Sequence, residues 1–214
     1  MPLLYLVFLS ILLIIILQLG IFGIVLEKVG LSANSAMFFL GSSLLGSLIN
    51  LPLFTINSSV KELPKDYQIP KSLFNPITIL RGKIIIMINA GGALIPICFS
   101  FYLISLHPLT LLQILPALSI VALISYIFSR PIKGLGIGIP VFIAPVTAAL
   151  VALIIAPAHS APLAYICGTL GVLIGADLFR LKDIKQMAIP VASIGGAGTF
   201  DGIFFTGIIA VLLA

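Results

Sequence analysis

The sequence predicts an all-α fold, a polytopic helical membrane protein with about seven transmembrane helices. The chain has 214 residues, of which 61% are hydrophobic and only 8% are charged. That apolar share is well above the roughly 45–50% of a soluble domain. No alternation of apolar and polar residues at period two supports a transmembrane barrel. At about 20 residues per crossing, the chain has room for some six to eight helices, so we expect a single integral membrane domain over residues 1–214.

Two of the expected spans contain residues that disfavour a regular helix. Asn89, two glycines and Pro96 fall within one span, which predicts a broken helix that lines a polar interior. Glycines at 134, 136 and 138 precede another span, which predicts either a re-entrant loop or a flexible start. In order, the spans are Leu3–Leu26, Ala33–Ile56, Ile84–Leu106, Pro108–Phe128, Gly134–Ile155, Pro162–Phe179 and a last helix from about Thr199 to Ala214.

The placement of lysine and arginine predicts the orientation of the chain. Residues 57–83 form the longest polar stretch, which we interpret as a cytosolic loop with an interfacial segment at Leu73–Leu80. With seven spans, ten of the eleven basic residues fall on one side of the membrane. By the positive-inside rule, the N-terminus is cytosolic and the C-terminus lies outside. We therefore expect a multi-pass protein of the cell (plasma) membrane, with a basic loop that contacts anionic membrane lipids.

Several classes of partner are not expected. The basic residues sit in short loops between helices, so they do not indicate binding to nucleic acid. Cys98 and Cys167 both lie inside apolar runs and are predicted to be small buried residues. No spacing of histidine, cysteine or acidic residues is typical of a metal site, so no metal and no cofactor is predicted.

Two aspartates stand out because they lie in or beside membrane-grade sequence. Asp177 follows an apolar segment three residues before Arg180, and Asp201 opens the apolar run that leads to Ala214. A carboxylate inside a membrane segment is costly to insert and is by default a candidate functional residue. Each is the natural partner of the other.

The depth of Asp201 depends on where the last helix begins. A helix continuous from Ile189 would carry Asp201 roughly 18 Å along its axis and away from Asp177. However, Ser193–Gly198 contains three glycines and is predicted to be non-helical. A helix from about Thr199 is only about 24 Å long, so it must begin near the membrane boundary to reach the other face. Asp201 would then lie at the depth of Asp177.

Two carboxylates at matched depth in a low-dielectric site are expected to share a proton. In an aspartic protease, one such carboxylate activates water while the other protonates the carbonyl oxygen. We expect the backbone of Gly195, Gly196, Gly198 and Thr199 to hold an extended substrate strand beside them. Asn50, Asn89 and Tyr165 are the predicted supporting polar residues. A purely structural carboxylate pair is the open alternative.

Two resemblances follow from these motifs. The stretch Gly-Ala-Gly-Thr-Phe-Asp201-Gly-Ile-Phe-Phe-Thr resembles the Gly-x-Gly-Asp-Phe-Ile-Phe-Tyr-Ser stretch of presenilins and signal peptide peptidases. The resemblance implies an intramembrane aspartyl protease, with its second catalytic aspartate at Asp177. In this chain Thr199 and Phe200 separate the glycine from the aspartate. Over nearly its whole length, the chain also resembles a prokaryotic membrane-protein family catalogued only as a domain of unknown function, through Gly41–Pro52, Asn89–Pro96, Arg130–Pro140, Tyr165–Leu178 and Gly195–Ala214.

The leading hypothesis is an intramembrane aspartyl protease-like protein that cleaves transmembrane segments of other proteins with Asp177 and Asp201. A proton- or cation-coupled transporter is the alternative from another class, in which the same aspartates, Asn50 and Asn89 line a pathway. A non-catalytic membrane scaffold is the third reading.

Overall fold

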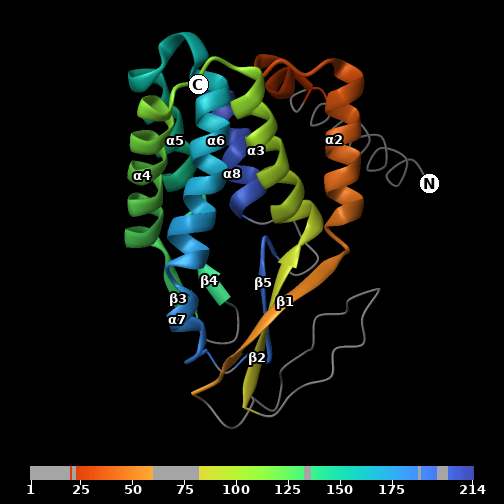
Figure 1. Ribbon diagram of the computed structural model, residues 1–214, viewed down its shortest axis with the longest axis vertical. Coiled ribbons are helices and arrows are strands. Elements are labelled where there is room, and N and C mark those ends of the chain that lie inside the picture. Colours follow the sequence, from red (N-terminus) through yellow and green to blue (C-terminus); the bar gives the residue numbers. More distant parts are fainter. Residues whose placement is uncertain (1–19, 21–22, 60–81, 133–135, 188, 197–201) are drawn as a thin grey trace, which may run out of the picture.

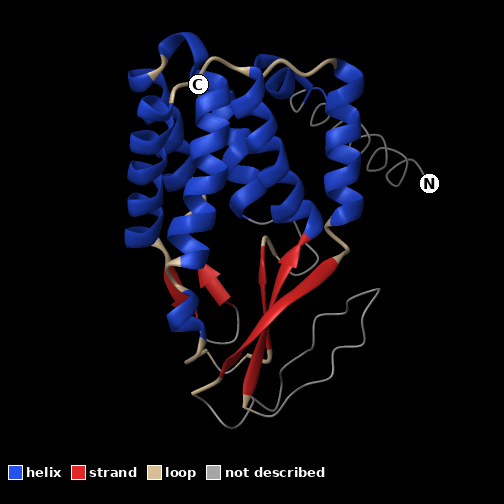
Figure 2. Cartoon of the chain, viewed as in Figure 1, coloured by secondary structure: helices blue, strands red, loops and turns tan. Residues whose placement is uncertain are grey.

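The computed structural model combines a bundle of helices with a small sheet at one end (Figures 1 and 2). It describes residues 20, 23–59, 82–132, 136–187, 189–196 and 202–214. The expected first span therefore lies mostly outside the described residues, as does most of the loop expected at 57–83.

The bundle is built from apolar helices that run between the sheet end and the opposite end of the molecule (Figure 1). Two π-helical segments extend it: η1 continues directly into α3, and η3 continues α6 toward the sheet. The helices are α2 (Ala33–Gly46), η1 (Ala90–Leu94), α3 (Ile95–Leu106), α4 (Leu111–Phe128), α5 (Ile143–Ile155), the short 3-10 helix η2 (Pro157–His159), α6 (Ser160–Val172), η3 (Leu173–Leu178), the short α7 (Leu181–Ile184) and α8 (Gly202–Leu213).

The sheet has three strands in the order β1-β2-β5. Strand β1 (Asn50–Asn57) pairs antiparallel with β2 (Lys83–Asn89), with Asn50 opposite Asn89 and an irregularity between Pro52 and Phe54. Strand β5 (Val191–Ile194) pairs parallel with β2. A separate two-stranded sheet joins β3 (Arg130–Ile132) to β4 (Gly136–Gly138).

The prediction of an all-α protein with about seven transmembrane helices is wrong. The segments expected to be helical at 50–56 and 84–89 form β1 and β2, so the spans predicted as Ala33–Ile56 and Ile84–Leu106 are each part helix and part strand. A short apolar run does not by itself distinguish a strand from a buried helix. The β-branched run Ile84–Ile86 favours a strand, and Pro52 disfavours a continuing helix. The predicted orientation, with a cytosolic N-terminus and the C-terminus outside, depends on seven crossings and therefore loses its basis.

Two helices of the described chain are long and apolar enough to cross a membrane, judged by length and composition. They are α4, with 18 residues, and the continuous helix Pro157–Leu178, with 22 residues. The helices over Ala90–Leu106, Ile143–Ile155 and Gly202–Leu213 are apolar but shorter.

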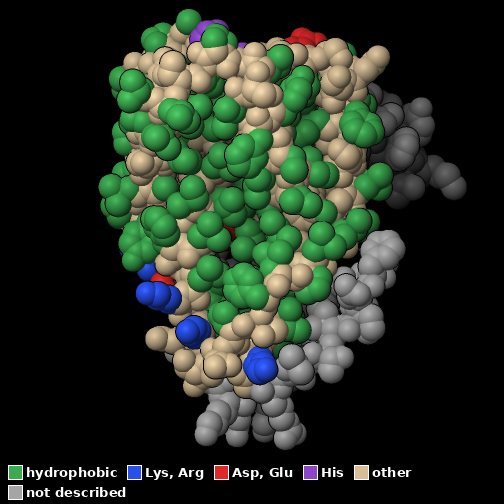
Figure 3. All heavy atoms as spheres, viewed as in Figure 1, with side chains coloured by type: hydrophobic (Ala, Val, Ile, Leu, Met, Phe, Trp, Pro, Cys, Tyr) green, Lys and Arg blue, Asp and Glu red, His purple; other side chains and the backbone are tan. Residues whose placement is uncertain are grey.

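The α6 helix lies at the centre of the bundle, and nearly all of its side chains are buried. It packs closely on α8: a Cβ at Gly207 would lie 2.5 Å from Oγ1 of Thr169, and a Cβ at Gly168 would lie 3.3 Å from Thr206. These close contacts require residues without side chains on the facing surfaces. The outward-facing wall, by contrast, is covered by apolar side chains (Figure 3).

Candidate functional site

Asp177 lies in η3, the π-helical last turn and a half of the long α6 helix. Its Oδ2 atom is buried, although the residue is at the end of the bundle that faces the sheet. Gly175 in the same segment packs against the carbonyl of Ala122 in α4, so closely that any side chain there would overlap it. Single π-helical turns within α-helices are frequent at functional sites, because the extra residue re-aims neighbouring side chains.

The packing of α6 on α8 sets which part of α8 lies beside η3. The two helices run antiparallel, since Gly207 faces Thr169 while, toward the other end, Oγ of Ser160 donates to the carbonyl of Ala214 at 3.2 Å. Following this register toward the sheet brings Gly202, the first residue of α8, about level with the start of η3. Ile203 accordingly shares one buried cluster with Val172 and Ala176. The residue before Gly202 in the sequence is Asp201.

The predicted glycine segment is only partly within the described residues. Gly198, Thr199 and Asp201 lie outside them, so the pairing of Asp201 with Asp177 stays a prediction. Ser193 and Ile194 belong to β5, and Gly195 and Gly196 follow in a turn with positive φ values of 81° and 92°. The prediction that this segment is non-helical is therefore confirmed from Ser193 to Gly196.

Asn50 and Asn89, predicted as supporting polar residues, are in direct contact. Nδ2 of Asn89 donates to Oδ1 of Asn50 at 3.1 Å and to the carbonyl of Ser47 at 2.6 Å. Oγ of Ser193 in β5 donates to the same Oδ1 of Asn50 at 2.7 Å. Oδ1 of Asn89 accepts from the N–H of Gly92 at 2.7 Å and thereby caps η1. We call Asn50, Asn89 and Ser193 the amide cluster; it joins β1, β2, β5 and η1.

The amide cluster lies beside a close contact between two backbones. A Cβ added at Gly92 would overlap the carbonyl oxygen of Gly195, and a Cβ at Gly195 would crowd Ala93. The amide cluster and this glycine contact together fix the end of β5 against the start of η1. In the sequence, Asp201 follows Gly195 by six residues.

Tyr165 does not join the site. It is fully buried in α6, where its ring packs edge-on against Phe99 with 4.9 Å between centroids. Twelve residues separate it from Asp177 along one helix, which corresponds to about 18 Å. Tyr165 is a core residue of the bundle.

A cavity of about 790 Å³ lies between α2 and α3. Its wall is mostly apolar, with Phe38, Phe99 and Ile95, and includes the hydroxyl group of Ser42. Cys98 also lines it and is exposed, so the prediction that both cysteines are buried holds for Cys167 alone. The cavity size is within the range of about 300–1,000 Å³ typical of ligand sites.

Sequence reasoning missed Ser193 and Arg180. The sequence places Ser193 in a glycine-rich stretch, in which the β-branched Val191 and Ile194 are the signal that favours a strand. From the sequence, Arg180 is only one of the basic residues that predict orientation. In the structure its guanidinium lies 4.2 Å from the ring centre of Tyr126 and pairs with Asp183. The signal in the sequence for this role is the position of Arg180, two residues after the end of a long apolar helix.

Comparison with known proteins gives a family but no assigned activity. No curated protein and no solved structure matches the chain. A family described as a protein of unknown function (DUF1614) matches residues 44–213. The match includes Asp177, Asp201 and the amide cluster, and it extends over most of the 214 residues. The chain belongs to this family.

Proposed function

We propose that this protein is an intramembrane aspartyl protease that cleaves transmembrane segments of other proteins with Asp177 and Asp201. Its bundle would be embedded in the cell membrane as a multi-pass unit. The observation that carries the proposal is the antiparallel register of α6 and α8, which brings the start of α8 beside η3. Asp177 belongs to η3, and Asp201 directly precedes α8.

The sheet supports the proposal by offering a place for an extended substrate. In the described chain β2 pairs with one edge of β5, and no strand pairs with the other edge. A peptide can add to a free edge through main-chain hydrogen bonds. Asp201 follows the end of β5 by seven residues in the sequence, and we propose that a peptide on that edge extends to the carboxylates. The extended form exposes the scissile carbonyl, as a protease needs.

The cavity between α2 and α3 supplies a place for the helical part of the substrate. Its apolar lining suits a membrane segment, and its Ser42 and Ile95 end lies next to Gly46, whose Cβ would be 3.0 Å from the backbone of Gly91. Gly91 is one residue from Gly92, which contacts Gly195. The cavity and β5 are thus linked through η1.

The chemistry follows from two carboxyl groups that hold one proton between them. The ionised carboxylate takes a proton from water as the water oxygen bonds to the scissile carbonyl carbon, while the protonated carboxyl group donates to the carbonyl oxygen. Collapse of the tetrahedral intermediate breaks the C–N bond: the carboxyl group that gained the water proton donates it to the leaving amine. The other carboxylate takes the proton from the former carbonyl oxygen, which restores the shared-proton pair. Low dielectric around the buried Oδ2 of Asp177 strengthens these interactions.

The transporter reading has weaker support. It assigned Asn50 and Asn89 to a polar pathway, but these amides satisfy one another, together with Ser193, Ser47 and Gly92. Groups engaged in this way are poorly placed to bind a passing cation.

Proton uptake by proteoliposomes that is lost in both aspartate variants, without any peptide cleavage, would favour transport over proteolysis.

The test uses the full chain in nanodiscs with a synthetic 20-residue leucine-alanine transmembrane peptide that carries a central glycine pair and a fluorophore–quencher pair. We expect cleavage by the parent protein and a loss of at least about one hundred-fold for Asp177→Asn and for Asp201→Asn, because neither amide can exchange a proton. Peptide fragments are measured by mass spectrometry.

Glu27→Gln is the control, because Glu27 is an exposed carboxylate beside Lys28, at the end of the bundle opposite η3. It should cleave at the parent rate. Equal cleavage by the parent and either candidate-site variant, or no cleavage by any of them, would count against the proposal.

A further inference from the structure

The sheet end of the molecule carries a concentration of positive charge. Of the six basic residues in the described chain, Lys28 is at the opposite end, and the other five lie on β2, β3, α7 or the turns beside α7. Figure 3 shows basic side chains at the lower end of the apolar wall, with an acidic group beside them, and histidine and further acidic side chains at the upper end. The five are Lys83, Arg130, Arg180, Lys182 and Lys185.

Little of this charge is neutralised within the described chain. Arg180 pairs with Asp183 at 3.0 Å, the one ion pair found there. The side chains of Lys83, Lys182 and Lys185 are exposed and form no ion pair with a described carboxylate. We call these three residues the basal lysines.

Backbone contacts hold the basal lysines close together. Lys83 pairs with Asn57 across the β1–β2 ladder. Two residues further, the N–H of Ser59 donates to the carbonyl of Lys185 at 2.9 Å. Strand geometry then places the Lys83 and Lys185 backbones within about 15 Å of each other. Lys182 lies one helical turn before Lys185.

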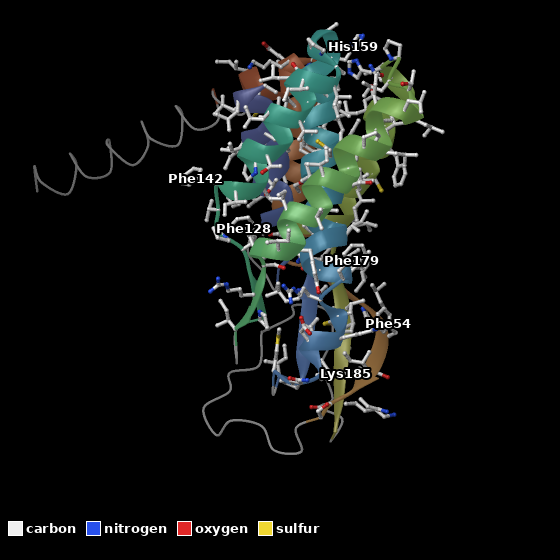
Figure 4. The ribbon with its side chains drawn as sticks, turned by 90° about the vertical axis from the view of Figure 1, so that its left-hand side faces the viewer. Phe54, Phe128, Phe142, His159, Phe179 and Lys185 are labelled. Carbon is white, nitrogen blue, oxygen red and sulfur yellow. The ribbon has the colours of Figure 1, made fainter. Side chains whose placement is uncertain are left out.

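Exposed apolar side chains lie a few residues from these lysines or from their ladder partners along the chain. Phe179, which is 59% exposed, precedes Lys182 by three residues. Phe54, 47% exposed, precedes Asn57 by three residues on β1, so its side chain points to the opposite face of the strand from those of Asn57 and Lys83; it is flanked by Leu53. Figure 4 shows Phe179 above Phe54 and Lys185, which are labelled at about the same level in the lower part of the molecule. Nucleic acid or an acidic protein would match the charge but leave these apolar groups in water. Lysines beside exposed apolar groups, below an apolar wall, match the boundary layer of an anionic bilayer.

We infer that the basal lysines bind the headgroups of anionic phospholipids in the leaflet at the sheet end, and that Phe54 lies in the same boundary layer. The phosphates pair with the ammonium groups, and Phe54 and Phe179 enter the outer part of the acyl layer. The inference rests on the membrane embedding proposed above, but not on catalysis.

The chain contains no tryptophan, so one introduced tryptophan reports its local lipids. The full-length Phe54→Trp variant is placed in bilayers of phosphatidylcholine with phosphatidylglycerol, and either lipid is brominated to quench the fluorescence. Each lysine near an anionic surface contributes about a five-fold preference. With three lysines, we therefore expect brominated phosphatidylglycerol to quench at least about five-fold more effectively per mole, and added salt to weaken this preference.

Two controls separate this inference from membrane embedding. Leu112 lies at the start of α4, at the end of the molecule opposite the sheet, and its side chain is 86% exposed in the parent. A tryptophan at this position (Leu112→Trp) should be quenched without preference between the lipids. Lys83→Gln/Lys182→Gln/Lys185→Gln, combined with Phe54→Trp, should abolish the preference. Quenching at position 112 with no lipid preference at position 54, or a preference that survives the three glutamines, overturns the inference. No quenching at either position instead overturns the embedding and the inference with it.

A measurement without tryptophan keeps the inference testable if a probe variant misfolds. Native mass spectrometry counts the phosphatidylglycerol molecules retained by the parent chain and by the triple-glutamine chain. Fewer retained molecules in the triple variant are expected, and equal numbers contradict the inference.

Discussion

Arg180 ties the end of α4 to the turn that follows η3. Its Nε donates to Oγ of Ser129 at 3.2 Å, and Nη2 donates to the carbonyls of Tyr126 and Ser129 at 2.9 and 3.0 Å. Nη1 pairs with Asp183 at 3.0 Å. Carbonyls at a helix C-terminus lack partners within the helix and carry partial negative charge, so a cation there is stabilising. Asp177 lies three residues before this anchor.

Replacing Arg180 by lysine should destabilise the protein although the charge is kept. A lysine ammonium cannot reproduce the planar fork of donors that reaches Tyr126, Ser129 and Asp183 together. We expect the free energy of unfolding to fall by about 1–3 kcal/mol, measured by thermal or chemical unfolding in detergent. Lys182→Ala, a change at an exposed neighbour, should stay within about 0.5 kcal/mol of the parent. Equal stability of Arg180→Lys and the parent contradicts the anchoring role.

At the residue scale, the sequence indicated which polar residues to consider as candidates, but it did not indicate what surrounds each of them. Asn50 and Asn89 could be chosen because each is a polar residue in an apolar segment, and they are hydrogen-bonded. Tyr165 met the same criterion but lies in the core, since a tyrosine ring is itself a large apolar group. Ser193 could not be chosen, because its role depends on the pairing of β5 with β2.

At the element scale, the joint between η1 and β5 determines where the segment leading to Asp201 begins. Two features hold it: the amide cluster and the approach of Gly92 to Gly195. Gly195 also has a φ of 81°, which glycine adopts without strain and other residues adopt at a cost. The joint therefore depends on glycine at both positions.

Gly92→Ala should weaken this joint. The added methyl group would overlap the carbonyl of Gly195, so η1 and β5 must separate, and such overpacking costs about 1–3 kcal/mol. Gly41→Ala is the matched control, because Gly41 lies within α2 and its added Cβ would meet nothing within 4 Å. We expect the control to gain about 0.5–1 kcal/mol of stability. Unfolding midpoints compare the two, and a Gly92→Ala protein as stable as the parent argues against a tight joint.

The predictability of an element depended on its length and its neighbours. The helix at 111–128 was predicted almost in full, because a predominantly apolar run of 18 residues between Thr110 and Ser129 leaves little alternative. The strands β1 and β2 were missed because each is a short apolar run whose structure is decided by pairing with distant residues. Residues 136–138 form β4, which neither the re-entrant loop nor the flexible start anticipated.

At the scale of the whole molecule, apolar and charged side chains lie at different levels along the long axis of the bundle. The wall of the bundle exposes large apolar side chains, among them Phe101 at 61%, Leu123 at 57% and Ile154 at 78%. A soluble monomer seldom exposes a continuous apolar surface of this kind. The lysines and the sheet lie beyond one end of that wall (Figures 1 and 3). This arrangement is expected of a protein whose middle is in lipid and whose sheet is at the boundary.

Cysteine labelling in intact membranes tests this arrangement. In a Cys98→Ser background, in which Cys167 stays buried, cysteine is introduced at Leu123 on the wall or at Lys185 beside the sheet. Both positions are exposed in the protein, so in water both should react with a charged maleimide at similar rates. In membranes opened to give the reagent access to both faces, we expect the variant at position 123 to react at least ten-fold more slowly, because a charged reagent is excluded from hydrocarbon. The difference should vanish after denaturation in detergent. Equal rates in membranes would mean that the wall of α4 faces water, and the proposed embedding would then be wrong.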